Sequence, residues 1–182
     1  MSDPAPPSID LFEAIHTARA QRLLKPDPVP EALIARVLDA AIRAPSAGNA
    51  QNWHFVVIRD AGQRRRAGAL YRKASDIAEA VYRARSRPAH LTEAQWQRMM
   101  TAGAHLWDHM GDAPVLLVPC LHQRDLPARD ALDPAWRDHY DAERAYLDRI
   151  RGASIYPAVQ NIILACRALG LGTVITTNDR CV

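Results

Sequence analysis

The feature that most constrains this chain is a sharp break between a helical pattern and a strand pattern. Apolar residues recur at helical spacing up to Ile42, and residues 54–58 (HFVVI) are typical of a strand. Residues 44–53 (APSAGNAQNW) lie between them, and we call this stretch the corner. Pro45 disfavours helical geometry at Ala44, and Gly48 and Asn49 tolerate positive φ. We therefore expect a tight helix-to-strand turn here.

The corner also carries polar side chains. Ser46, Asn49 and Gln51 offer a hydroxyl and two amides, which suit an uncharged polar partner such as a heterocycle or a polyol. Ordinary connecting loops are built from the same residue types. Composition alone therefore leaves both interpretations of the corner open.

Length and composition exclude several classes of protein. A chain of 182 residues predicts one domain, residues 1–182, and no apolar run approaches the roughly 20 residues that span a bilayer. Residues 1–8 (MSDPAPPS) lack the basic and apolar parts of a signal peptide, so we expect a cytoplasmic location and a flexible segment over residues 1–9. The net charge is only +3, and the run 64–66 (RRR) has no interleaved aromatics, which favours a solvated helix face over nucleic-acid binding.

Cysteine and histidine spacing does not favour a metal site. Cys120, Cys166 and Cys181 are far apart and form no CxxC pair, so we expect reduced thiols. His105 and His109 are spaced i, i+4, but the Glu of the zinc-protease pattern is missing between them.

Periodicity and turn residues predict the order of the elements. Helices are expected over residues 9–20, 30–43, 62–85, about 92–110, a stretch that includes Trp136, Tyr140 and Tyr146, and 154–170. Strands are expected over residues 54–58, 113–120 and 173–177. The pattern predicts that Leu70, Ile77 and Val81 point inward, that Ser154 is an N-cap, and that Gly170 ends the last helix.

Two further patterns each allow two interpretations. If the first helix continues far enough, Arg19 and Arg22 project from one side and could hold a dianionic phosphate; the alternative is a cationic helix end that answers the macrodipole. Met99, Met100, Gly103 and Trp107 share a helical face. A cofactor-facing wall is one explanation of that face, and core packing or a subunit contact is the more common one. The polar residues 121–135 are a candidate substrate lid.

Three blocks of sequence together resemble the FMN-dependent nitroreductase family. They are residues 19–30 (RAQRLLKPDPVP), the corner, and residues 160–172 (QNIILACRALGLG). The resemblance covers nearly the whole chain from about Leu11. It implies an α+β, nitroreductase-like three-layer α/β/α fold with a mainly antiparallel sheet, assembled as a homodimer with two FMN sites at the subunit interface.

The resemblance also implies roles for particular residues. Arg19 and Arg22 would hold the phosphate and ribityl end of FMN, with Ala20 and Gln21 between them. Pro45, Ser46, Ala47 and Asn49 would approach the flavin from the partner subunit, and Gln51 would lie near the ring edge. Residues 175–178, which include Thr176 and Thr177, correspond to the turn whose amides meet the isoalloxazine.

The chain departs from the family pattern at three places. Ala20 stands where Ser is usual, Asn52 replaces the usual Pro, and the usual C-terminal strand and tail are expected to be absent. The resemblance implies an oxidoreductase that passes a hydride from NAD(P)H through FMN to a small electron-poor acceptor in a ping-pong mechanism. A flavin-fragmenting enzyme of cobalamin lower-ligand synthesis and a non-catalytic flavin-binding or dimerising module are the alternatives.

Overall fold

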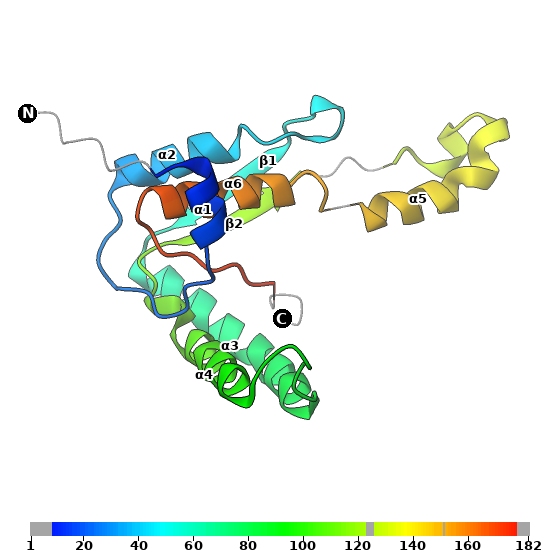
Figure 1. Ribbon diagram of the computed structural model, residues 1–182. Helices are drawn as coiled ribbons and strands as arrows, with labels where there is room; N and C mark the ends of the chain where they lie inside the picture. The colour runs from blue at the N-terminus through cyan, green and yellow to red at the C-terminus, as the bar shows by residue number, and fades with distance from the viewer. Residues whose placement is uncertain (1–8, 123–125, 151, 178–182) are drawn as a thin grey trace, which may run out of the picture.

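The computed structural model describes residues 9–122, 126–150 and 152–177 of the chain. Figure 1 shows helices around a small sheet, with one arm that projects away from them. In chain order the elements are α1 (Leu11–Thr17), α2 (Glu31–Ala41), η1 (Ala47–Asn49), β1 (Trp53–Ile58), α3 (Ala61–Ala84), α4 (Glu93–His109), η2 (Met110–Asp112), β2 (Leu116–Leu121), η3 (Arg129–Ala131), η4 (Pro134–His139), α5 (Tyr140–Arg149) and α6 (Tyr156–Ala168). The predicted α+β class is confirmed.

One hydrophobic core lies between α2, α6 and one face of the sheet. Its centre is formed by Ala41 and Ala158, each 0% exposed, and Phe55 and Leu117 pack against it from the strands. Small side chains at the centre let the two helices approach closely. Asn161 Nδ2 donates to the carbonyl oxygen of Ala40 at 2.9 Å and fixes their register.

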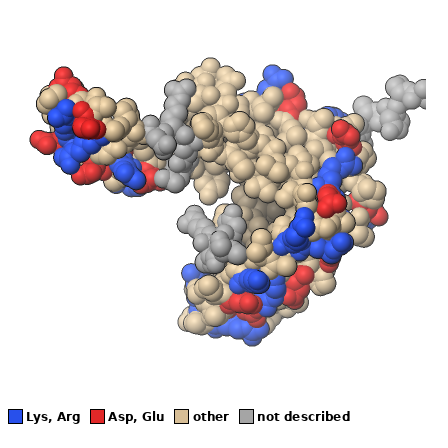
Figure 2. Space-filling view, turned by 180° about the vertical axis from the view of Figure 1, so that it is seen from behind, with Lys and Arg blue, Asp and Glu red and all other residues tan. Residues whose placement is uncertain are grey.

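The two strands pair antiparallel and leave their other face partly open. Val56 lies opposite Val118 in the ladder, and these side chains are 52% and 41% exposed. Figure 2, seen from behind, shows few charged side chains at the centre of the molecule, whereas charges gather over the arm and over the end formed by α3 and α4. The sheet therefore presents apolar side chains to solvent in a single copy of the chain.

A second cluster joins α3 to α4. Tyr71 packs with Leu106 and Trp107, and the Arg72 guanidinium lies 3.1 Å from an Asp108 carboxylate oxygen across the two helices. Arg64 donates to the carbonyl oxygens of Gly111 and Ala113. The first arginine of the 64–66 run is thus a link between α3 and η2, which the interpretation as a solvated helix face did not include.

Cys120 and Cys166 are free thiols. Burial raises the pKa of the Cys166 thiol to about 11, so this group stays protonated at ordinary pH. Cys181 and Asn178 lie outside the described residues, as do residues 1–8 of the segment that we expect to be flexible. His105 and His109 stack with ring centroids 4.3 Å apart, and the described residues contain no group of three or more potential metal ligands.

The end of the first helix and the third strand were predicted wrongly. α1 ends at Thr17 and the backbone turns extended at Ala18, because Ala20 pairs with Thr173 in a parallel bridge. Arg19 and Arg22 consequently do not share a helical face. Beyond that bridge, the described part of residues 173–177 has no ladder partner, and these residues face a cavity instead.

The inward face of α3 was also predicted wrongly. Leu70, Ile77 and Val81 are 48%, 57% and 45% exposed, whereas Tyr71 and Ala74 are buried. Periodicity identified residues that share one face of the helix. It could not identify the neighbouring face, because that choice depends on where α4 packs.

The arm comprises η3, η4 and α5, which contact one another and project beyond the rest of the chain (Figure 1). Trp136 and Tyr146 are 65% and 47% exposed on it. Residues 123–125 of the candidate lid lie outside the described residues, so the lid stays a prediction. Among the described helices, none is both long and apolar enough to cross a membrane.

Candidate functional site

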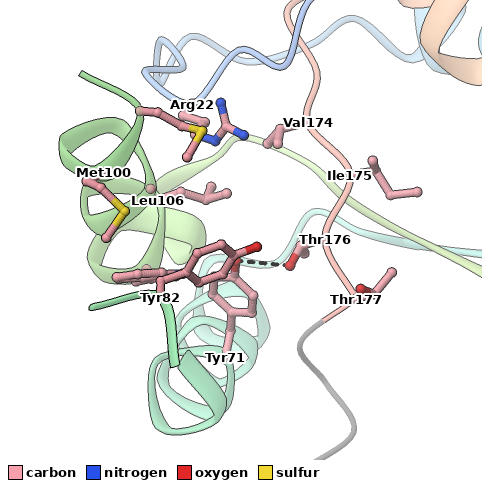
Figure 3. A pocket seen from close by; sticks show the side chains of 12 residues that line it. Arg22, Tyr71, Tyr82, Met100, Leu106, Val174, Ile175, Thr176 and Thr177 are labelled. Carbon is pink, nitrogen blue, oxygen red and sulfur yellow. Dashed lines mark hydrogen bonds between the residues drawn. The ribbon is translucent and has the colours of Figure 1, made fainter. Parts of the chain in front are cut away.

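Three of the predicted site residues line one cavity. Arg22, Thr176 and Thr177 meet there with side chains from α3 and α4 around a volume of about 220 Å³ (Figure 3). The other lining residues are Tyr71, Tyr82, Met99, Met100, Gly103, Leu106, Trp107, Val174 and Ile175. The cavity therefore joins segments from the two ends of the sequence with the middle of the chain.

Backbone pairing brings Arg22 to this cavity. The Gln21 amide donates to the carbonyl oxygen of Thr173 at 2.8 Å, and Ala20 forms the parallel bridge with the same residue. Arg22 follows directly and is half-buried beside Val174. Ala20 and Gln21 thus help to place Arg22 through their main-chain groups. These groups are the same whether position 20 holds Ala, as here, or the Ser that is usual in the family.

Arg19 and Arg22 have different surroundings. Arg19 is exposed, and its guanidinium donates to the Ala18 carbonyl oxygen at 2.6 Å. Arg22 lines the cavity, and within the described residues no side chain or carbonyl group is recorded as bonding its guanidinium. A planar cation at the edge of an apolar cavity is suited to an anionic or electron-rich part of a ligand. The structure brings only one of the two predicted arginines to the site.

The wall of the cavity is aromatic and thioether-rich. Tyr82 lies at a tilt of 40° to Trp107, with ring centroids 6.4 Å apart, and Met99 and Met100 complete the α4 side. Gly103 has no atom nearer than 4.0 Å to where a Cβ would be, so it keeps this side open. Flat apolar surfaces of this kind accept a planar ring.

This wall was not among the site residues predicted from the sequence. One feature of the sequence could have indicated it, namely the face of α4 that carries Met99, Met100 and Trp107. Core packing or a subunit contact was the more common explanation of that face, so its residues were not predicted as site residues. Tyr71 and Tyr82 of α3 carried no signal at all, because the predicted inward face of that helix was a different one.

The corner is built as predicted. φ is +59° at Gly48, +52° at Asn49 and +46° at Gln51, so three of four consecutive residues are left-handed. The Ser46 hydroxyl accepts from the Gln51 amide at 2.9 Å, and the Gln51 side chain donates to Asn49 Oδ1 at 2.8 Å. Pro45, Asn49 and Gln51 are exposed and Ser46 is half-buried. The polar side chains that could meet a ligand are held by one another.

Ser154 attaches the corner to the start of α6. Its hydroxyl accepts from the Ala47 amide at 3.0 Å, and its carbonyl oxygen accepts from the Trp53 indole at 2.9 Å. The prediction that Ser154 caps the helix was wrong, since α6 begins at Tyr156 with no side-chain cap. The hydroxyl bonds the distant corner, which is a tertiary contact that sequence spacing does not reveal.

Replacing Ser154 with Ala is expected to lower the free energy of unfolding by about 1–2 kcal/mol, because the Ala47 amide loses its partner in a part-buried position. Urea denaturation followed by circular dichroism measures the change. Ser75→Ala is the matched control: Ser75 is also buried, but its hydroxyl bonds the Tyr71 carbonyl one helical turn away. That local bond adds little to a helix, so equal losses in the two variants would contradict the role assigned to Ser154.

The corner and the cavity lie apart within one chain. Figure 1 shows the corner beyond the end of α2, at the other end of the molecule from α3 and α4. Pro45, Ser46, Ala47, Asn49 and Gln51 are absent from the cavity lining. A site that uses both regions would need two copies of the chain.

Comparison with known proteins identifies the family. The Nitroreductase family profile matches residues 15–178, so the chain belongs to this family. This confirms the family resemblance predicted from the sequence.

Two relatives show the range of proteins that the chain resembles. It is 46% identical over 59 residues to an NADH dehydrogenase of Thermus thermophilus, which is 32% of this chain and 29% of that protein. It is 28% identical over 155 residues to the 5,6-dimethylbenzimidazole synthase of Rhodospirillum rubrum, covering 85% of this chain and 62% of that protein. The chain thus matches less than two thirds of the length of either relative.

Solved structures share the fold. A BluB-like flavoprotein from Clostridium difficile superposes with a TM-score of 0.65 at 21% identity, covering 94% of this chain and 76% of that one. A nitroreductase from Bacteroides fragilis with bound FMN superposes with a TM-score of 0.51 at 16% identity, covering 90% and 67%. The nitroreductase-like fold is confirmed, and the dimeric state stays a prediction.

Proposed function

We propose that the protein is an FMN-dependent oxidoreductase, in which the cavity beside Arg22 holds part of the flavin. The observation that carries the proposal is the meeting of Arg22, Thr176 and Thr177 with a flat apolar wall. The donors fit the group: the guanidinium suits the electron-rich edge or the phosphate of FMN, and the aromatic and methionine side chains suit its ring. When bound, FMN accepts a hydride and passes it to a second substrate.

The reaction is a hydride transfer from NAD(P)H to an electron-poor small molecule, such as a nitroaromatic, a quinone or an enone, in a ping-pong sequence. The residues of this chain bind and orient the reactants, and no side-chain nucleophile is needed. The apolar wall also limits the access of water to the ring. The family membership and the name of the Thermus relative support this assignment.

In the proposed function, the active form of the protein is a homodimer in the cytoplasm. The corner of one copy would close the cavity of the other, because the two regions lie apart within one chain (Figure 1). Apolar surface for such contacts is available at two places. One is the open sheet face with Val56 and Val118, and the other is the exposed face of α3 with Leu70, Ile77 and Val81.

The absorption spectrum of the purified protein tests the cofactor. Any flavin gives absorption bands at about 370 and about 450 nm. We expect these bands after incubation with FMN and gel filtration, and steady NADH or NADPH oxidation on addition of a nitroaromatic. A protein that stays colourless would overturn the proposal.

A second candidate is a flavin-fragmenting enzyme, favoured by the similarity to 5,6-dimethylbenzimidazole synthase over 85% of the chain. Reduced FMN and oxygen without any other acceptor separate the two functions. Loss of flavin with release of dimethylbenzimidazole supports the second candidate, and reoxidation of intact flavin supports the first.

A further inference from the structure

Two hydroxyl groups meet at the wall of the cavity. Thr176 Oγ1 donates to Tyr71 Oη at 2.9 Å, which joins the segment 174–177 to α3 (Figure 3). Tyr71 is 6% exposed, and both residues line the cavity. This bond connects positions 105 residues apart in the sequence.

The number of hydrogens in this pair has a chemical consequence. Each hydroxyl carries one hydrogen, so a single bond between them leaves one hydrogen over. Whichever hydroxyl donates to the other, one hydrogen of the pair is left over at the cavity wall, and the described parts of the chain offer it no acceptor. Tyr71 carries that hydrogen when Thr176 is the donor. A hydroxyl at a largely buried position needs an acceptor, which a ligand in the cavity can supply.

We propose that Tyr71 is a ligand-recognition residue, which donates a hydrogen bond to a ring carbonyl or ring nitrogen of the heterocycle bound in the cavity. Thr176 is a positioning residue that fixes the direction of the Tyr71 hydroxyl. The inference rests on the proposed function. It extends that function by saying which part of the ligand, a ring carbonyl or ring nitrogen, lies against the α3 side of the cavity. Arg22 and Tyr71 together present one charged and one neutral donor to a planar ligand.

Tyr146 provides a control outside the cavity. It lies on the arm, is 47% exposed, and does not line the cavity. Removal of its hydroxyl therefore shows what a Tyr-to-Phe change does to FMN binding when no cavity residue is altered.

The experiment titrates FMN into flavin-free protein and follows the quenching of flavin fluorescence. Tyr71→Phe is expected to weaken FMN binding about 5- to 10-fold, and Tyr146→Phe by less than about twofold. Thr176→Val is expected to lower FMN affinity about 2- to 3-fold, and to lower it no further in a protein that already carries Tyr71→Phe. Loss of the donor should also shift the visible absorption band of bound FMN, which a merely structural change would not do.

The outcomes separate the inference from the proposed function. If the wild-type protein binds FMN and Tyr71→Phe equals it in affinity and spectrum, the inference is wrong and the proposed function stands. If the wild-type protein takes up no FMN, both are wrong. Should Tyr71→Phe fail to fold, Thr176→Val decides: an unchanged affinity and band position in that variant overturn the inference, and a 2- to 3-fold loss supports it.

Discussion

Replacement of Arg22 by Ala is expected to weaken FMN binding roughly 10- to 100-fold, because hydrogen bonds to a charged group contribute about 1.5–3 kcal/mol. Arg22 lines the cavity beside Thr176 and Thr177. Within the described residues, its guanidinium has no hydrogen-bond or ion-pair partner. Fluorescence titration of flavin-free protein measures the dissociation constant. The FMN affinity of Arg22→Lys should lie between that of the wild type and that of Arg22→Ala, since Lys keeps the charge and loses the planar fork.

Arg19→Ala is the control for this experiment. Its guanidinium is exposed and bonds the Ala18 carbonyl oxygen, so its removal is expected to change FMN affinity by less than about threefold. If Arg19→Ala costs as much as Arg22→Ala, the paired-arginine phosphate site predicted from the sequence is right. The single-arginine site that the structure indicates would then be wrong.

Replacement of Gly68 by Ala is expected to lower the free energy of unfolding by about 2–3 kcal/mol. A Cβ on Gly68 would lie 2.8 Å from both Cα and N of Gly111, and backbone atoms cannot move aside as a flexible side chain can. α3 and η2 would have to separate, and the bonds from Arg64 to the Gly111 and Ala113 carbonyl oxygens would stretch. Urea denaturation gives the midpoint and the slope from which the change is obtained.

The same substitution at Gly103 should act in the opposite direction. Gly103 is also inside a helix, but a Cβ added there would have Trp107 Cζ2 as its nearest neighbour, at 4.0 Å. With space available, the gain in helix propensity dominates and stabilises the protein by about 1 kcal/mol. Two Gly-to-Ala changes that shift stability equally would show that the close α3–η2 approach is unimportant.

The parts of the fold that could be predicted from sequence depend on local chemistry. Pro45 and Gly48 determine the corner because their allowed backbone angles are intrinsic to the residues, and positive φ at Gly48 and Asn49 was expected and is observed. Pro157 in the first turn of α6 and Gly170 just beyond its end are signals of the same kind. Such features need no knowledge of the neighbouring elements.

The parts that could not be predicted depend on which surfaces meet. Leu70 and Tyr71 are adjacent in α3, and nothing local indicates that Tyr71 packs on Trp107 whereas Leu70 faces solvent. Ser154 resembles a helix cap in sequence, but its hydroxyl bonds Ala47, 107 residues away. The cavity wall was missed for the same reason, since its members come from elements whose packing the sequence does not specify.

The left-handed run in the corner has a thermodynamic consequence for whatever the corner touches. Gly48, Asn49 and Gln51 already occupy the backbone conformation that the turn requires, and internal hydrogen bonds hold the side chains of Ser46, Asn49 and Gln51. Association therefore has little chain entropy left to remove from this stretch. The corner can recognise a partner as a preorganised surface, and the interaction energy it gains is not offset by the cost of ordering a loop.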